Sequence, residues 1–227
     1  MTFIETVPEA DATGAVQEMY ETDRAVFGDL PNLTQAFSLR PEVYAAWRQL
    51  NGSIKAGMDL RRYELATLAA ARRLRSSYCT LAHGSVLMKN AFLTPDALRE
   101  LMEDTDADAH GGAAAAAELD PVDRAVMGLA DKVADDATSV TQADVAVMDL
   151  ADKVADDATA VTAADVDRLR GLGLSDTDIL DVVLTAAARC FFSTCLDALG
   201  AAPDAKYAAL DPAIRDALTV GRPIATE

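Results

Sequence analysis

The sequence is poor in aromatic residues and in β-branched runs. Aromatic residues make up 5% of the 227 residues, whereas 51% are hydrophobic, and much of that fraction is alanine. Alanine favours helices, and the residue types that favour strands are scarce. We therefore expect an all-α fold. A chain of this length suits a single domain, residues 1–227, with a substantial core.

Positive charge is also scarce, because 20 Lys and Arg stand against 37 Asp and Glu, a net charge of −17. Such a surface repels polyanions, so we expect no nucleic-acid partner and no binding to anionic membranes. We also expect no apolar run long enough to span a membrane. The first residues, MTFIETVPEADATG, carry acids where a signal peptide has basic and apolar regions, which predicts a cytoplasmic protein.

Cysteine and histidine are few. The cysteines are Cys79, Cys190 and Cys195, and the histidines are His83 and His110. Three cysteines do not suggest a secreted disulfide framework. His110 lies in the segment DTDADAHGGAAAAA, residues 104–117, which we interpret as an exposed, flexible connection. No motif implies a metal or an organic cofactor.

One segment gathers most of the chemically useful side chains. Residues 61–90 read RRYELATLAAARRLRSSYCTLAHGSVLMKN and include Glu64, Ser76, Cys79 and His83. The four-residue spacing of Cys79 and His83 places both on one face of a helix. Ser76 is a suitable N-cap, so Cys79 would lie in the first turn, where free N–H groups and the helix dipole favour a thiolate. The imidazole can take the thiol proton, and Glu64 can orient the imidazole or hold a relaying water.

Each of these residues also has a structural interpretation. A lone cysteine on an apolar helix is commonly a small core residue, as we expect for Cys190 and Cys195. From the residues alone, Glu64 is more readily explained as a solvated acid in the first turn of a helix, favoured there by the helix dipole. Five arginines form a basic cluster that either makes surface ion pairs or binds an anionic substrate. They are Arg61, Arg62, Arg72, Arg73 and Arg75.

The motif resembles the signature of the alkylhydroperoxidase D-like, or carboxymuconolactone decarboxylase, superfamily. Its redox members carry a Glu and, twelve residues later, the start of Cys-x-x-Cys-x-x-x-His. Here Glu64 is followed at that distance by Ser76, then by Cys79 and His83, so the first cysteine is replaced by serine. The flanking segments GDLPNLTQAFSLRPEVYAAW and GLGLSDTDILDVVLTAAARC resemble the peroxidase-related branch. The resemblance implies an alkylhydroperoxidase D-like helical fold and a homo-oligomer.

The resemblance first implies a thiol-dependent peroxidase, an antioxidant oxidoreductase. Cys79 would attack a hydroperoxide, with His83 and Glu64 as a proton relay. Ser76 cannot form the disulfide of the redox members, but it could donate a hydrogen bond to the Cys79 sulfur. Reduction would then come from an external thiol, or would not occur efficiently. A sharper hypothesis assigns it to Cys190 or Cys195.

Two other functions stay open. A lyase or hydrolase of the decarboxylase branch would use Glu64 and His83 for acid–base chemistry on a small lactone or keto acid. In that case Arg72, Arg73 or Arg75 would bind a carboxylate. The third interpretation is a non-catalytic oligomeric scaffold whose site decayed after a cysteine was lost.

Residues 125–166 contain a tandem duplication of a helical segment. The copies AVMGLADKVADDATSVTQADV (125–145) and AVMDLADKVADDATAVTAADV (146–166) differ at three positions. Each ends in Thr-x-x-Asp, at Thr141 and Thr162, a capping-box pattern that predicts a helix start. Relative to the superfamily pattern one copy is extra, and nothing in the sequence assigns it a function.

Overall fold

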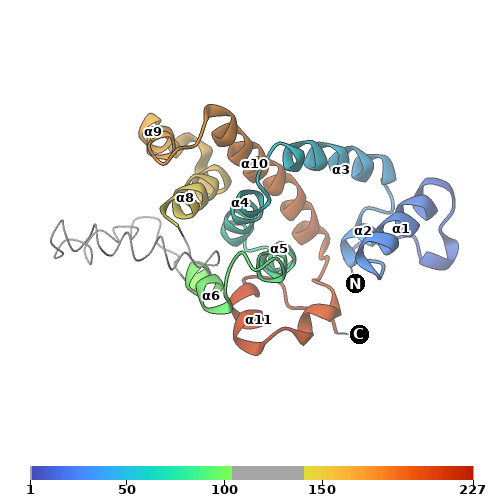
Figure 1. The fold of residues 1–227 in the computed structure, drawn as a ribbon. Helices are drawn as coiled ribbons and strands as arrows, with labels where there is room; N and C mark the ends of the chain where they lie inside the picture. The colour runs from blue at the N-terminus through green and yellow to red at the C-terminus, as the bar shows by residue number, and fades with distance from the viewer. Residues whose placement is uncertain (1, 104–140, 227) are drawn as a thin grey trace.

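The structure, a computed structural model, describes residues 2–103 and 141–226, and this part of the chain contains helices and no strand (Figure 1). The helices are α1 Gly14–Phe27, α2 Asn32–Ala36, α3 Pro41–Ala56, α4 Leu60–Arg73, α5 Ser77–Lys89, α6 Pro95–Glu103, α8 Gln142–Asp157, α9 Ala163–Gly171, α10 Asp176–Leu199 and α11 Pro212–Leu218. The predicted all-α class is therefore confirmed. The segment 104–117, with His110, and most of the first repeat copy lie outside the described residues.

Helix starts follow the capping signals of the sequence. Thr141, Thr162 and Ser175 each accept a hydrogen bond from the amide three residues later, and the Asp at that position bonds back to the cap residue's own amide. The capping boxes predicted at the ends of the two repeat copies are thus confirmed at the starts of α8 and α9. Asp59 caps α4 by accepting a hydrogen bond from the amide of Arg62.

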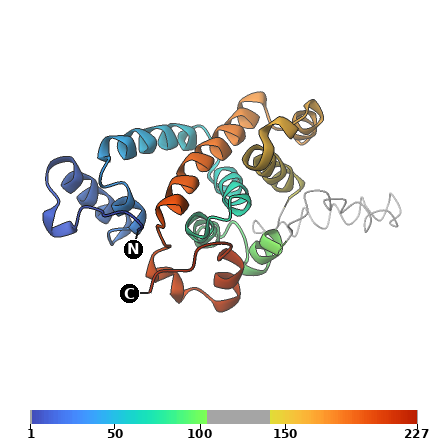
Figure 2. The same ribbon diagram turned by 180° about the vertical axis from the view of Figure 1, so that it is seen from behind.

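Helix α4 is the centre of the fold. Every residue from Tyr63 to Ala71 is buried. Figures 1 and 2 show α4 surrounded by α5, α8 and α10, the helices that it contacts most. A helix that is buried on all sides belongs to the interior of a domain. This position carries Glu64 into the protein interior.

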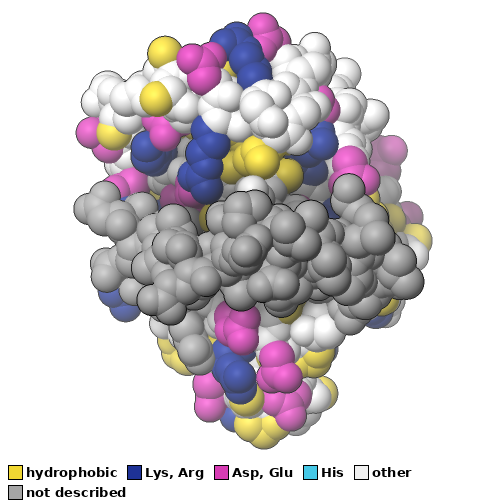
Figure 3. All heavy atoms as spheres, turned by 60° about the vertical axis from the view of Figure 1, so that its left-hand side comes forward, with side chains coloured by type: hydrophobic (Ala, Val, Ile, Leu, Met, Phe, Trp, Pro, Cys, Tyr) yellow, Lys and Arg dark blue, Asp and Glu magenta, His cyan; other side chains and the backbone are white. Residues whose placement is uncertain are grey.

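The arginines of α4 bind acids on α8 and α10. The ion pairs are Arg61 with Asp144 at 2.7 Å, Arg72 with Asp152 at 2.5 Å, Arg73 with Asp156 at 2.5 Å, and Arg62 with Asp178. On the side of the molecule drawn in Figure 3, Lys and Arg side chains are interspersed with Asp and Glu. These four arginines therefore join helices, as the ion-pair interpretation of the cluster predicted.

Helix α10 is the long apolar helix of the described part of the chain. It has 24 residues. Among the described residues, it is the one helix that is long and apolar enough to cross a membrane by length and composition alone. The core helix of a soluble protein passes the same test, so this is weak evidence for a span. One side of α10 packs against α4 and α8, and that side carries the buried Arg189 and Ser193. We therefore interpret α10 as a core helix.

Candidate active site

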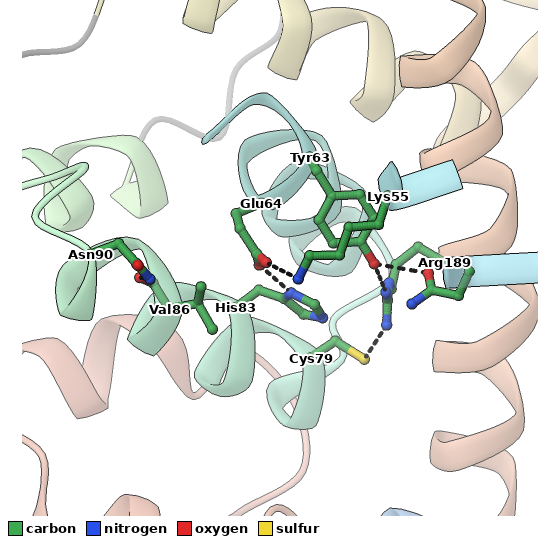
Figure 4. Close-up of polar contacts among 9 residues, drawn as sticks. Lys55, Tyr63, Glu64, Cys79, His83, Val86, Asn90 and Arg189 are labelled. Atoms are coloured by element: carbon green, nitrogen blue, oxygen red, sulfur yellow. Dashed lines mark hydrogen bonds and ion pairs between the residues drawn. The ribbon is translucent and has the colours of Figure 1, made fainter. Parts of the chain in front are cut away.

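Glu64 and His83 form a hydrogen-bonded pair between α4 and α5 (Figure 4). Nδ1 of His83 lies 2.5 Å from Oε2 of Glu64, and Nζ of Lys55 lies 3.3 Å from Oε1 of Glu64. Glu64 is only 1% exposed, so the interpretation of Glu64 as a solvated acid is wrong. The sequence could not decide this point, because the burial of α4 on all sides is a tertiary property.

The surrounding charges set the protonation of this pair. Burial raises the pKa of the Glu64 carboxyl, but His83 and Lys55 outweigh it and bring the pKa below its ordinary value. Burial lowers the pKa of His83, and although Glu64 opposes this effect, Arg189 and Lys55 add to it, so the pKa stays below 6.5. At neutral pH the pair is therefore a carboxylate and a neutral imidazole. Nδ1–H of His83 then donates to Glu64, and Nε2 is left as the proton acceptor.

Cys79 lies in the first turn of α5, as its spacing from Ser76 predicts, and is 2% exposed. Two side chains of α10 contact its sulfur: Oγ of Ser193 at 3.2 Å and the guanidinium of Arg189 at 3.7 Å. Figure 4 shows Cys79 and His83 on the same side of α5, with His83 toward Glu64 and the sulfur toward Arg189. The structure thus brings three of the four predicted site residues together.

Ser76 is the exception. It is fully buried at the N-cap position of α5, but its side chain makes no capping hydrogen bond. The serine that contacts the Cys79 sulfur is Ser193, so the predicted hydrogen bond from Ser76 to that sulfur does not form. Within the described residues, the buried hydroxyl of Ser76 has no hydrogen-bond partner.

Arg189 is a site residue that the sequence analysis missed. It is 2% exposed, and no carboxylate in the described part of the chain forms an ion pair with it. Its guanidinium lies 3.4 Å from the hydroxyl of Tyr63 and near the rings of Trp47 and Phe192, at 5.9 and 5.7 Å. Burial lowers the pKa of Arg189, but the sulfur of Cys79 and the oxygen of Tyr63 outweigh it and raise the pKa above its ordinary value.

One signal in the sequence could have identified Arg189. It is the sole charged residue in the run LTAAARCFFSTC, residues 184–195. A charge in the middle of an apolar helix must be solvated, paired or functional. The periodicity of α10 alone does not say which, because the partner sulfur comes from a distant part of the sequence.

Cys190 and Cys195 are half-buried rather than buried, and burial raises the pKa of both thiols. Cys195 packs against the hydrophobic cluster that includes Cys79. All three cysteines are free, and neither Cys190 nor Cys195 is among the polar contacts of the Cys79 sulfur. Within the described residues, no group of three His, Cys, Asp or Glu side chains could hold a metal ion.

Comparisons with known proteins agree with this architecture. Residues 41–122 match the carboxymuconolactone decarboxylase family model. No curated protein sequence matches the chain significantly. The structure is similar to the alkylhydroperoxidase AhpD core of an uncharacterized peroxidase-related protein from Ralstonia eutropha JMP134, with a TM-score of 0.63 and 18% identity over 91% of this chain and 94% of the other. It is also similar to an uncharacterized peroxidase-related protein from Silicibacter sp. TM1040, with a TM-score of 0.60 and 21% identity over 92% and 94% of the two chains. At these identities the structural likenesses show the fold alone.

Proposed function

The chain is an alkylhydroperoxidase D-like member of the carboxymuconolactone decarboxylase superfamily, and from that premise we propose that it is a thiol-dependent peroxidase acting through Cys79. One observation carries the proposal. Arg189 is buried beside the Cys79 sulfur, and no carboxylate among the described residues neutralises it. A buried guanidinium needs an anionic partner, and the thiolate of Cys79 is the group in position to supply it.

The charges of the site support this assignment. Glu64 is negative, Lys55 and Arg189 are positive, and His83 is neutral, so a thiolate on Cys79 brings the balance to zero. Two unit charges about 4 Å apart attract each other by roughly 4 kcal/mol at an effective dielectric constant of about 20. The hydroxyl of Ser193 adds a hydrogen bond to the sulfur. Thiolates, not thiols, are the nucleophiles in peroxide reduction.

The first half-reaction uses His83 and Glu64 together with Cys79. The Cys79 thiolate, whose proton has left the site through Nε2 of His83, attacks the distal oxygen of the hydroperoxide. An S–O bond forms while the O–O bond breaks, so Cys79 becomes a sulfenic acid and the hydroperoxide leaves as an alcohol. A proton that Nε2 of His83 takes up from water neutralises the departing alkoxide. Glu64 holds the ring through Nδ1 while Nε2 accepts and returns that proton.

The second half-reaction needs an external thiol, because Ser76 stands where a second motif cysteine would be. One thiol condenses with the sulfenic acid to give a mixed disulfide and water. A second thiol releases Cys79 as a thiol, and the external partner leaves as its disulfide. A reducing cytoplasm, the location expected from the sequence, would supply such thiols. Because Cys79 is 2% exposed, we propose small organic hydroperoxides as substrates.

The test is consumption of tert-butyl hydroperoxide in the presence of dithiothreitol, followed for the native chain, Cys79→Ser and the double variant Cys190→Ser/Cys195→Ser. We expect Cys79→Ser to abolish turnover and dimedone to trap a sulfenic acid on Cys79 of the native chain. We expect the double variant to retain turnover with external thiol. Undiminished turnover by Cys79→Ser would overturn the proposal. A Cys79–Cys190 or Cys79–Cys195 disulfide in a peptide map, with loss of turnover in the double variant, would move the resolving role to α10.

One observation favours a second function, the lyase chemistry of the decarboxylase branch. The neutral His83, held by Glu64, can move protons without any sulfur. Turnover of a small carboxylate-bearing lactone that survives Cys79→Ser but not His83→Gln would support it. Arg72 and Arg73, two of its suggested carboxylate anchors, are already paired with Asp152 and Asp156. A chain inert in both assays would favour the scaffold.

A further inference from the structure

Tyr63 lies between the two halves of the candidate site. It immediately precedes Glu64 on α4 and is 1% exposed. Successive residues of a helix point about 100° apart, so the two side chains reach different partners. Glu64 reaches His83, whereas the hydroxyl of Tyr63 points toward Arg189 (Figure 4). The sequence analysis gave Tyr63 no role, because a tyrosine on a core helix is commonly a packing residue.

The hydroxyl of Tyr63 has a defined direction. It donates to Oδ1 of Asn51 at 2.8 Å, and Nη2 of Arg189 lies 3.4 Å from the same hydroxyl oxygen. An amide oxygen can only accept a hydrogen bond, and a guanidinium can only donate. The O–H of Tyr63 therefore points at Asn51, and its lone pairs face Arg189.

Within the described part of the chain, Tyr63 supplies the one oxygen that accepts a hydrogen bond from Arg189. Nη1 of Arg189 contacts the Cys79 sulfur at 3.7 Å, and Nε is buried without a partner. The ring centroids of Trp47 and Phe192 lie 5.9 and 5.7 Å from the guanidinium carbon, and flat rings do not fix its direction. An arginine side chain has many rotamers, so its charge needs an anchor to stay beside the sulfur.

We propose that Tyr63 is a positioning residue that holds the guanidinium of Arg189 against the Cys79 sulfur. Its hydroxyl contacts Asn51 and Arg189 rather than the reacting atoms, so it acts through Arg189. A donor that is already in place stabilises a charge without having to be ordered at each turnover. The inference rests on the proposed peroxidase, because it concerns the nucleophile of that reaction.

This anchor matters most when the sulfur carries no charge. In the sulfenic acid and in the mixed disulfide, Cys79 no longer supplies the anion that attracts Arg189. The hydrogen bond between Tyr63 and Arg189 does not depend on that anion, so it keeps the guanidinium in place. When the second external thiol attacks the mixed disulfide, Cys79 leaves as a thiolate and finds Arg189 already beside it. The positioning therefore serves both half-reactions.

A substitution that removes only the hydroxyl leaves the other titratable groups of the site in place. Nζ of Lys55 lies 5.1 Å from the centroid of the Tyr63 ring, and the His83 ring meets that ring edge-on at 6.2 Å. Phenylalanine at position 63 keeps these ring contacts, and Glu64 keeps its own bond to His83. Tyr207 also interacts with the sulfur, but burial raises its pKa, so it stays uncharged across the range of the test.

The test is the pH dependence of Cys79 alkylation by iodoacetamide, read by mass spectrometry of the Cys79 peptide after reaction of the full chain. In Tyr63→Phe the midpoint of the pH–rate profile should rise by about 0.5–1 pH unit, the worth of about one hydrogen bond. In the Arg189→Met chain the same substitution should change nothing, because no guanidinium is left to hold. Tyr20→Phe is the matched control. It removes the hydroxyl of another buried tyrosine, which donates to the main chain of Val7, and should keep the native profile.

Asn51→Ala is the milder second variant. It removes the acceptor that directs the O–H of Tyr63, so the midpoint should rise by less than in Tyr63→Phe. Circular dichroism shows which variants keep their helices, and Asn51→Ala decides the matter if Tyr63→Phe does not fold.

An unchanged midpoint in the folded variants would overturn the proposal. A shift of equal size in the Arg189→Met background would also overturn it, because Tyr63 would then act by some route other than Arg189. Alkylation needs no hydroperoxide, so this result is separate from that of the peroxidase assay. A chain without turnover in which Tyr63→Phe still raises the midpoint would lose the peroxidase and keep the positioning role.

Discussion

The guanidinium of Arg189 lies 3.7 Å from the sulfur of Cys79, although 110 residues separate them in the sequence. This contact joins α10 to the helix that carries the proposed nucleophile. It also gives the buried Arg189 a direct partner, since no carboxylate of the described chain forms an ion pair with it. The reactivity of Cys79 should therefore depend on a residue outside the motif segment.

Replacing Arg189 by Met should slow the alkylation of Cys79 by iodoacetamide at pH 7 by about tenfold or more, since a loss of about 1.4 kcal/mol of thiolate stabilisation corresponds to a factor of about 10. Arg189→Lys keeps the positive charge, so its rate of Cys79 alkylation should lie between the rates of the native chain and Arg189→Met. The rate is read by mass spectrometry of the Cys79 peptide. Arg168→Met removes an arginine that pairs with Asp149 at the surface and should leave the rate unchanged. Equal alkylation rates in Arg189→Met and the native chain would show that Arg189 does not stabilise the thiolate.

The sequence predicted the part of this site that depends on local spacing. The four-residue interval of Cys79 and His83 fixed their common helix face, and the Glu64 position followed from the likeness to a known motif. The partners supplied by α10 were not predictable in this way, because Arg189 and Ser193 reach the sulfur only through tertiary packing. The capping boxes at Thr141 and Thr162 were also predictable, because each depends on two residues that are three positions apart in the sequence.

Acidification from pH 7.5 to 5.5 should lower the free energy of unfolding, and His83 should account for part of the loss. Its pKa in the folded protein is below the ordinary value of 6.5, because burial disfavours the charged imidazole. The unfolded chain therefore binds more protons near and below pH 6.5, so this stability is present above pH 6.5 and is lost as the pH falls toward the folded pKa. Each unit of pKa difference is worth about 1.4 kcal/mol.

The measurement is urea denaturation at a series of pH values, for the native chain and His83→Gln. The slope between pH 7.5 and 5.5 should be shallower in the variant. The chain has two histidines, so His110→Gln is the matched control for the loss of one imidazole. A second loss should follow below pH 4.5, because the lowered pKa of Glu64 makes its carboxylate a stabilising group only above that range. Identical slopes in the native chain and His83→Gln would contradict the assignment.

The ion pair between Arg72 and Asp152 should be costly to break from one side. The two side chains are 10% and 6% exposed and join α4 to α8. Asp152→Leu leaves the guanidinium of Arg72 buried without its carboxylate, which should cost about 3–5 kcal/mol of unfolding free energy. The double variant Arg72→Met/Asp152→Leu should recover most of that loss, because a buried pair can be replaced by apolar side chains at little cost.

The control for this pair is its more exposed neighbour. Arg73 and Asp156 are 30% and 59% exposed, so Asp156→Ala should cost less than about 1 kcal/mol. Denaturant titrations of the variants give the comparison. A cost for Asp152→Leu no larger than that of Asp156→Ala would show that burial of the Arg72 pair adds nothing to its strength.

Removing one copy of the duplication should leave a folded chain. Deletion of residues 125–145 joins Arg124 to Ala146 and places Asp123 at the position that Asp144 holds relative to the second copy. The ion pair that Asp144 makes with Arg61 can therefore be rebuilt by Asp123. Every buried residue of α8 from Ala146 onward is kept, so the unfolding temperature should change by only a few degrees.

Deletion of residues 146–166 is the matched control, because the two products differ at just three positions. One of them places Gly128 where Asp149 stands. Asp149 pairs with Arg168 at 2.6 Å, and glycine in a helix interior costs about 1 kcal/mol relative to a good helix former. Because aspartate is itself a weak helix former, only part of that figure applies, and with the surface ion pair the chain that lacks 125–145 should be the more stable by about 0.5–1 kcal/mol. The reverse order would mean that the first copy, rather than the second, supplies the contacts with α4 that stabilise the protein.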